Sequence, residues 1–233
     1  MAVFAGPRIV EDGLVVHLDA ANEKSYDGTS TWKDLVAERN MVLYGSPTFN
    51  TSGFLSFNGV NQYGLQTNEY NFSSSVDYCF EVWFKMRTLP TAQYGDNGHI
   101  WGGQNGNNLV LYLNPASNGK SKLNMIHDDS RYSGGGHFSN YQIEANEWVQ
   151  WVAMGDASTD KIAHYINGEL DKDFSAVISG QEVKSWGDAR LAYDSRWSKY
   201  SELDVAVLKQ YNRLLTAAEV KQNFEALRGR FGI

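Results

Sequence analysis

The sequence predicts an all-β protein, an antiparallel β-sandwich with one short C-terminal α-helix. About nine to twelve short apolar or alternating segments are separated by clusters of glycine, asparagine, aspartate and serine, which is typical of a two-sheet sandwich. A last strand and the chain's one strong helix signal follow at the C-terminal end. No linker, charge run or repeat divides the 233 residues. We therefore expect a single domain over residues 1–233, with residues 1–12 as a candidate N-terminal arm.

The predicted strands follow one another along the whole chain. Residues 78–86 show the clearest alternation, with Phe80, Val82 and Phe84 on one face and the intervening residues on the other. Residues 161–166 end at Asn167-Gly168, the preferred pair for a tight hairpin turn. The remaining predicted strands are residues 14–18, 54–57, 109–113, 123–127, 148–154, 189–193 and 203–208. Residues 88–108 and 128–147 are expected to be long loops, which in compact domains are usually functional or mobile.

The C-terminal helix is expected over residues 216–229. Thr216 and Glu219 have the spacing of a capping box, and Gly229 has the position of a C-terminal stop. One face of this helix is apolar and is expected to dock on a sheet: Val220, Phe224 and Leu227.

Composition and charge exclude several classes of protein. Hydrophobic residues make up 42% of the chain and aromatic residues 13%, which is ample for a packed core. The net charge of −7 argues against a nucleic-acid partner or an anionic membrane surface. No segment has the length of apolar sequence that a membrane span needs, and the first residues lack a secretory signal pattern. We expect synthesis in a cytoplasm without export and no membrane insertion. With Cys79 as the single cysteine, neither an internal disulfide nor a cysteine-based zinc site is expected.

Aromatic residues in the loops are the best candidates for a binding site. Sugar rings pack their C–H faces on aromatic rings while neighbouring polar groups bond the hydroxyls. Tyrosine and tryptophan are also enriched at protein interfaces, so a glycan and a protein partner are both open. The candidate residues are Tyr94, Asp96, Asn97, His99, Trp101, Tyr132, Trp197 and Tyr200.

Metal binding is not expected. The five histidines are scattered without ligand spacing. Asp96, Asp128, Asp129, Asp156 and Asp160 are either pieces of calcium loops or turn residues that bond their own backbone, and the second interpretation is favoured because a calcium site needs several converging oxygens. No cofactor is expected, and calcium has no support in the sequence.

Several segments in the right order resemble a known family. Residues 13–21 and 31–35 resemble its first elements, and residues 57–63 resemble its "F-D-G-x-N-D-Y" turn. Residues 80–85 are similar to its "E-x-W-x-K" strand, residues 165–168 to its "Y-x-N-G" hairpin and residues 207–220 to its "Y-N-R-x-L-[ST]-x-x-E" ending. The family is the laminin-G-like, pentraxin-like group of concanavalin A-type lectin/glucanase sandwiches, which have a jelly-roll fold.

The two ends of the chain add a narrower resemblance. Residues 6–10 and 222–232 resemble versions of this domain in tailed-bacteriophage virion proteins, notably those of cyanophages. The resemblance implies a non-enzymatic sandwich displayed on a particle or cell surface, which often binds glycans or other proteins. The turn that often carries an acidic residue in the family has Asn58, Asn61 and Gln62 here, which argues against a family-type calcium site.

One strand resembles a catalytic motif. Residues 202–206 are similar to the "E-x-D-x-E" strand of sandwich-fold glycoside hydrolases, in which alternate carboxylates share one face. Glu202 and Asp204 match, but Ala206 occupies the third position, so one essential carboxylate is missing. We therefore expect no catalytic site.

Three functions follow, in order of preference. The first is a non-catalytic phage virion structural protein, a capsid decoration or a tail- or fibre-associated module on the outer surface of the virion. It would be made in the host cytoplasm, would contact other virion proteins and could be oligomeric. The second is a lectin module that binds host cell-surface glycans, and the third is a degenerate glycoside hydrolase.

Overall fold

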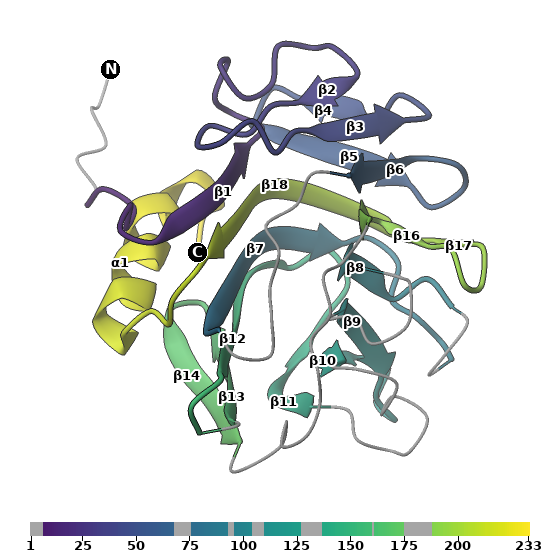
Figure 1. Ribbon diagram of the computed structural model, residues 1–233. Helices are drawn as coiled ribbons and strands as arrows, with labels where there is room; N and C mark the ends of the chain where they lie inside the picture. The colour runs from purple at the N-terminus through teal and green to yellow at the C-terminus, as the bar shows by residue number, and fades with distance from the viewer. Residues whose placement is uncertain are drawn as a thin grey trace.

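The computed structural model describes residues 7–67, 76–92, 96–103, 110–126, 137–159, 161–174 and 188–233. Their strands form two eight-stranded antiparallel sheets, which we call sheet A and sheet B, and one two-stranded hairpin (Figure 1). The predicted all-β, concanavalin A-like sandwich with one C-terminal helix is therefore confirmed.

Sheet A runs in the order β14-β13-β12-β7-β18-β5-β4, and β1 also pairs with β18. The long central strand β18 pairs with β7 on one side, and with β5 and then β1 on the other. The strands of sheet A are β1 (Leu14–Asp19), β4 (Thr48–Asn50), β5 (Phe54–Asn58), β7 (Tyr78–Met86), β12 (Trp148–Asp156), β13 (Lys161–Ile166), β14 (Glu169–Phe174) and β18 (Glu202–Tyr211).

Sheet B runs in the order β11-β10-β9-β8-β15-β6-β3-β2. Its strands are β2 (Thr31–Trp32), β3 (Met41–Tyr44), β6 (Tyr63–Gln66), β8 (His99–Gly102), β9 (Val110–Pro115), β10 (Ser121–Ile126), β11 (His137–Ile143) and β15 (Ala189–Leu191). The separate hairpin consists of β16 (Tyr193–Asp194) and β17 (Lys199–Tyr200).

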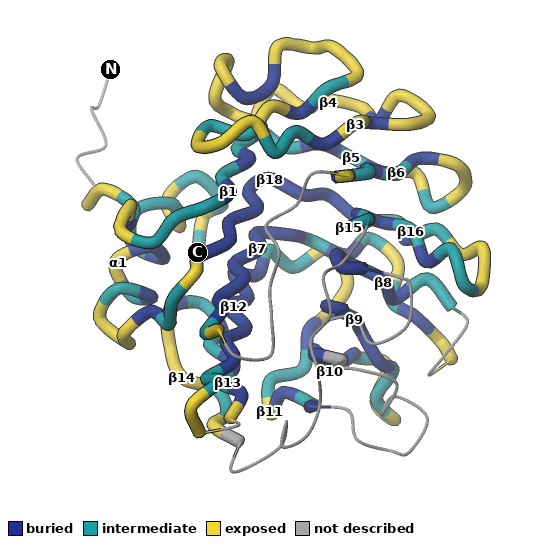
Figure 2. The backbone as a smooth tube through the Cα atoms, in the orientation of Figure 1, coloured by how far each residue is buried: buried dark blue, intermediate teal, exposed yellow. Residues whose placement is uncertain are grey.

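The main core lies between the two sheets. Figure 2 shows β7, β12 and β18 as a largely buried centre, surrounded by exposed turns. Phe80 and Trp151 of sheet A pack in this core with Trp32 and Trp101 of sheet B, and the Phe80 and Trp101 rings meet edge to face at 5.5 Å. The alternation predicted for residues 78–86 is confirmed, because the odd-numbered residues point to the other face of sheet A.

Two strands occupy segments that we expected to be loops. β8 lies within residues 88–108, and β11 lies within residues 128–147. β8 is only four residues long in a glycine-rich segment, and β11 carries polar residues on both faces, so neither has the apolar alternation that identifies a strand. Both strands are defined by hydrogen bonds to neighbouring strands, and the periodicity of the sequence does not predict these bonds.

The helix α1 (Ala217–Leu227) forms a third layer on the outer face of sheet A (Figure 1). The predicted capping box is present: Glu219 donates its N–H to the Thr216 hydroxyl at 3.2 Å, and Thr216 donates its N–H to the Glu219 carboxylate at 2.8 Å. Phe224 stacks on Trp83 of β7 at 5.8 Å. The α-helix ends at Leu227 with Arg228 as its C-cap, so Gly229 directly follows the cap as expected; the chain continues in a 3₁₀ turn, Arg228–Arg230, and the positive φ of 73° is found at Gly232.

A buried ion pair joins sheet A to this helix. The Glu81 carboxylate and the Lys209 ammonium lie 3.0 Å apart, and neither side chain is exposed. Trp83 and Gln150 donate to the same carboxylate at 2.9 and 3.0 Å, and Asn223 of α1 donates at 2.7 Å. Burial raises the pKa of Glu81, but the Lys209 charge and these hydrogen bonds outweigh it and hold the pKa below its usual value. Every oxygen of the buried carboxylate therefore has a donor.

The described part of the expected N-terminal arm is tied to the same network. The Val10 N–H donates to the Asn223 side chain at 2.8 Å, and the Tyr211 hydroxyl donates to the Val10 carbonyl at 3.0 Å. Gln222 donates to the Arg8 carbonyl at 2.7 Å. Residues 8–10 therefore lie against α1, while residues 1–6 are outside the described residues.

Three histidines are held neutral by burial. Burial, with the nearby Lys209 charge, lowers the pKa of His17 to about 4. Burial lowers the pKa of His99 to about 4 and the pKa of His164 to about 3. Each value lies below the ordinary pKa of 6.5, so protonation of these side chains opposes the folded state.

Replacing Lys209 with alanine should destabilise the domain by about 3–5 kcal/mol, because it leaves the Glu81 carboxylate buried without its cation. The measurement is the free energy of unfolding in urea. Lys221→Ala is the matched control, since Lys221 pairs with Glu169 at 2.6 Å while the two side chains are 43% and 75% exposed. Its expected loss is below about 1 kcal/mol. Equal losses in the two variants would contradict the structural role assigned to the buried pair.

Acidification from about pH 7.5 to about pH 5 should reduce the stability of the domain. The unfolded state binds more protons in this window, since its histidine pKa values exceed those of the folded state, whereas most carboxylates stay ionised. The stability is fully present above the ordinary histidine pKa and is lost as the pH falls toward the folded-state values. His164→Asn removes one of the three groups, so the urea midpoint of this variant should depend less on pH. An unchanged pH dependence in the variant would count against burial of a neutral His164.

Candidate functional site

Four tyrosines form a cluster on the outer face of sheet B. Tyr44 and Tyr63 lie opposite each other on β3 and β6, and their rings stack at 4.6 Å. Tyr193 and Tyr200, paired across the β16–β17 hairpin, stack at 4.3 Å. The Tyr63 and Tyr193 rings join the two pairs at 5.1 Å. Tyr44 at one end of the row is 41% exposed, so the tyrosine cluster, defined as these four residues, is open to a ligand at that end.

The hairpin is held rigidly in this position. Ala192 adopts a left-handed φ of 63°, which separates β16 from β15 and redirects the chain. The Asp194 carboxylate is buried and accepts hydrogen bonds from the Arg196 Nε at 2.8 Å and from the Arg196 backbone N–H at 3.0 Å. Burial raises the pKa of Asp194, but the Arg196 hydrogen bonds and nearby charges outweigh it and hold the pKa below its usual value. Trp197, at the turn, is 46% exposed beside this fixed frame.

The structure brings only part of the predicted site residues together. Tyr200 is a member of the tyrosine cluster, and Trp197 lies in the turn of the same hairpin. Asp96 closes its own loop instead: its carboxylate accepts N–H groups from Thr91 at 2.7 Å and Ala92 at 3.0 Å, while Asn97 follows it. Tyr94 and Tyr132 lie outside the described residues.

Two predicted residues have no exposed surface. Trp101 lies on β8 and points into the core between the sheets. His99 is buried, and its Nε2 lies 3.0 Å from the Arg190 carbonyl. Because residues 99–102 form a strand of the sheet rather than a loop, the neighbouring strands and the core bury their side chains. Neither ring is placed where it can contact a ligand.

Sequence analysis missed Tyr44, Tyr63 and Tyr193 as site residues. Tyr63 was assigned to a turn motif and Tyr193 to a strand end, and β3 was not predicted. A usable signal exists in Met41–Tyr44, a short apolar run between the turn residues Asn40 and Gly45. The contact between the two tyrosine pairs cannot be predicted from local sequence patterns, since residues 67–192 separate β6 from the hairpin.

The two carboxylates of the glycosidase-like strand are engaged by cations. Asp204 is buried and accepts a hydrogen bond from Ser56 at 2.7 Å, while Lys85 pairs with it at 2.9 Å. Glu202 accepts a hydrogen bond from the Thr88 hydroxyl and lies 3.8 Å from the Arg87 guanidinium. These contacts place the pair in a charge network on sheet A.

Acidic residues in the described turns bond their own backbone. Asp156 accepts the N–H groups of Ser158 and Thr159 at 2.8 and 3.1 Å, which matches the turn interpretation given above for Asp96 and Asp156. Asp128, Asp129 and Asp160 lie outside the described residues. Within the described ranges, no three His, Cys, Asp or Glu side chains gather as a metal site would require, and no helix is long and apolar enough to cross a membrane.

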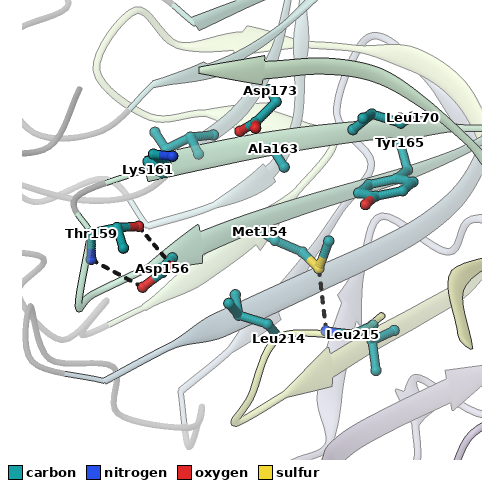
Figure 3. Close-up of a pocket in the computed structure, with 11 residues that line it drawn as sticks. Met154, Asp156, Thr159, Lys161, Ala163, Tyr165, Leu170, Asp173, Leu214 and Leu215 are labelled. Carbon is teal, nitrogen blue, oxygen red and sulfur yellow. Dashed lines mark hydrogen bonds between the residues drawn. The ribbon is translucent and has the colours of Figure 1, made fainter. Parts of the chain in front are cut away.

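A separate hollow of about 330 Å³ lies on the outer face of sheet A, beside the loop that leads into α1. Figure 3 shows Met154 and Leu214 on one side of it and Tyr165 and Leu170 on the other, with Lys161 among the polar residues. The lining combines apolar side chains with the polar residues Asp156, Thr159, Lys161 and Asp173. The hollow contains none of the residues predicted to bind a ligand.

Comparisons with known proteins agree with this architecture. The structure is similar to the Trypanosoma rangeli sialidase in complex with 2,3-difluoro-KDN, with a TM-score of 0.66 and 16% identity over 94% of this chain and 33% of the sialidase chain. It is also similar to the binding domain of botulinum neurotoxin DC in complex with SialylT, with a TM-score of 0.68 and 11% identity over 93% of this chain and 52% of the toxin chain. At these identities the likeness concerns the fold alone.

Comparison of the sequence with known proteins identifies a family but no individual relative. No curated protein matches the sequence significantly. The family model described as the concanavalin A-like lectin/glucanases superfamily, Laminin_G_3, matches residues 58–221, which is more than half of the chain. With its two-sheet sandwich and docked C-terminal helix, the chain belongs to the concanavalin A-like lectin/glucanase superfamily as a Laminin_G_3 domain.

Proposed function

We propose that this domain is a non-catalytic carbohydrate-recognition module and that the tyrosine cluster, with Trp197 beside it, contacts the glycan. The observation that carries the proposal is the row of half-exposed rings fixed on the outer face of sheet B. Tyr44, at the end of the row, is 41% exposed, and Trp197 is 46% exposed. Aromatic faces bind the C–H surfaces of sugars, and phenolic hydroxyls bond sugar hydroxyls. A rigid hairpin presents both without a large ordering cost on binding.

Relatives in fold support the proposal by analogy. One similar structure is a toxin binding domain in complex with SialylT, and another concerns botulinum neurotoxin type C, whose cell entry depends on two ganglioside molecules. Both are similar to this chain over more than nine-tenths of its length but at low identity. Carbohydrate recognition by this sandwich therefore has precedent among its structural neighbours.

The absence of catalysis is part of the same proposal. A two-carboxylate mechanism needs an acid and a nucleophile or base that both reach the substrate. Asp204 is buried under Lys85 and Ser56, and Ala206 stands where a third carboxylate would be required. These contacts support a structural role for the strand.

The setting we propose is the outer surface of a bacteriophage virion, after synthesis in the host cytoplasm. The sequence resemblance of both chain ends to phage virion proteins motivates it, and it gives the second candidate function, a capsid decoration or tail- or fibre-associated module that contacts other virion proteins. Residues 8–10 and the C-terminal Ile233 both lie on the α1 side of sheet A, whereas the β16–β17 hairpin lies at the far side of the domain (Figure 1). A particle protein bound on the α1 side would leave the tyrosine cluster facing outward.

Tyr44→Ala should weaken glycan binding by about tenfold, the effect of losing about 1.4 kcal/mol of ring contact. The glycan is first identified on an array, with calcium and with chelator, and the two conditions should give the same result. Affinity is then measured by calorimetry. Phe49→Ala is the matched control, because Phe49 is 42% exposed on sheet A, against 41% for Tyr44 on sheet B. An array without binding in either condition would overturn the lectin proposal, as would equal effects of the two substitutions.

Mass spectrometry of purified virions should detect this chain if the proposed setting is correct. A high copy number relative to the major capsid protein is expected for a decoration protein, and a low copy number for a tail or fibre module. Its absence from virions that are made while the chain is expressed would contradict the virion role, and it would leave the glycan experiment unaffected.

A further inference from the structure

Arg190 lies among the rings of the tyrosine cluster. It occupies β15 on the outer face of sheet B, between Leu65 of β6 and Gly102 of β8. Its guanidinium lies over the Tyr193 ring, 5.5 Å from the ring centre. Burial raises the pKa of Tyr63 and Tyr200, and the Arg190 charge opposes the shift in both, which places the cation close to these rings as well.

Arg190 differs from most other described arginines because it has no carboxylate partner among the residues that the structure describes. Five arginines pair with carboxylates in the described part of the chain: Arg87, Arg196, Arg213, Arg228 and Arg230. Within those same residues no carboxylate pairs with Arg190, and its Nε, like those of Arg87 and Arg230, is buried without a hydrogen-bond partner. The Arg190 side chain is only partly buried and its charge has no carboxylate partner among the described residues, so an anionic group from outside can pair with its guanidinium.

The surroundings favour an anion of defined shape. A guanidinium presents a planar fork of N–H donors that matches two oxygens of one acidic group. The flanking rings reduce the local dielectric and strengthen that attraction. Gly102 contributes no side chain on the β8 side of Arg190. The domain carries a net charge of −7, so an acidic ligand requires such a local cation to overcome the overall repulsion.

We propose that Arg190 binds the acidic group of the glycan, and that the ligand of the tyrosine cluster is therefore an acidic glycan, bearing a carboxylate or a sulfate ester. The inference rests on the proposed carbohydrate function and names the class of sugar. Tyr44 and Trp197 contact the sugar rings, and Arg190 distinguishes acidic from neutral glycans.

The test starts from a glycan array that holds neutral, carboxylate-bearing and sulfated glycans. Acidic glycans should dominate the bound set, and the two acidic classes show which group the site prefers. The best acidic ligand and its neutral counterpart, methyl-esterified or desulfated, are then compared by calorimetry. The wild-type domain should prefer the acidic form by about tenfold, the discrimination expected for one charge-assisted bidentate contact.

Three variants separate charge recognition from general effects. Arg190→Gln should bind the acidic and neutral forms equally, while Arg190→Lys should keep part of the preference because it keeps the charge but loses the fork. Lys199→Gln is the matched control, since it removes one positive charge from an exposed position on the same hairpin and should keep the full preference. The urea midpoints of all variants are compared to confirm that they fold.

The outcomes distinguish this inference from the function on which it rests. Binding confined to neutral glycans, or an acid preference that survives in Arg190→Gln, overturns the role of Arg190 and leaves a lectin. If Lys199→Gln loses the preference for acidic glycans as fully as Arg190→Gln does, the preference is a general effect of charge, and the specific role of Arg190 is overturned. Absence of binding to every glycan overturns the carbohydrate function itself.

Discussion

The buried pair of Glu81 and Lys209 determines how the layers of this domain fit together. Two buried charges at the centre of sheet A are tolerable only if they pair closely and further hydrogen bonds satisfy the carboxylate oxygens. Neighbouring strands provide Trp83 and Gln150, but the second carboxylate oxygen is bonded by Asn223, which belongs to α1. The helix therefore completes a polar network as well as covering apolar residues. The same asparagine accepts the Val10 N–H, so the N-terminal segment and the C-terminal helix are positioned by one group.

The two outer faces of the sandwich differ in the groups that cover them. The outer face of sheet A is occupied by α1, the 3₁₀ turn and the ion pairs of Asp204 and Glu202. The outer face of sheet B carries the hairpin and the tyrosine cluster, which is exposed at Tyr44. Both described ends of the chain lie on the α1 side of sheet A, away from the tyrosine cluster.

Membership of the concanavalin A-like superfamily does not by itself assign a function, because such sandwiches include both enzymes and binding domains. The distinction depends on individual side chains. Carboxylates paired with lysine and arginine on sheet A favour structure over catalysis. Rings without a covering layer, next to an arginine without a carboxylate in the described chain, favour recognition. These local features carry the proposed function, and the fold supplies only the rigid support.

Local patterns in the sequence were sufficient for β7, for the Asn167-Gly168 turn and for the capping box at Thr216, because alternation, turn chemistry and capping act over a few residues. They also showed Ala206 at the third position of the glycosidase-like strand, where that motif has a carboxylate. They did not reveal β8 and β11, whose strand character comes from hydrogen bonds to partners distant in sequence. For the same reason Trp101, expected on a binding loop, lies in the core, and Tyr44, Tyr63, Tyr193 and Arg190 were not recognised as one site. The sequence by itself determined the sandwich and its capped helix. Only the tertiary structure decided which aromatic rings are buried and which meet on the surface, because strand register and the turn at Ala192 set those positions.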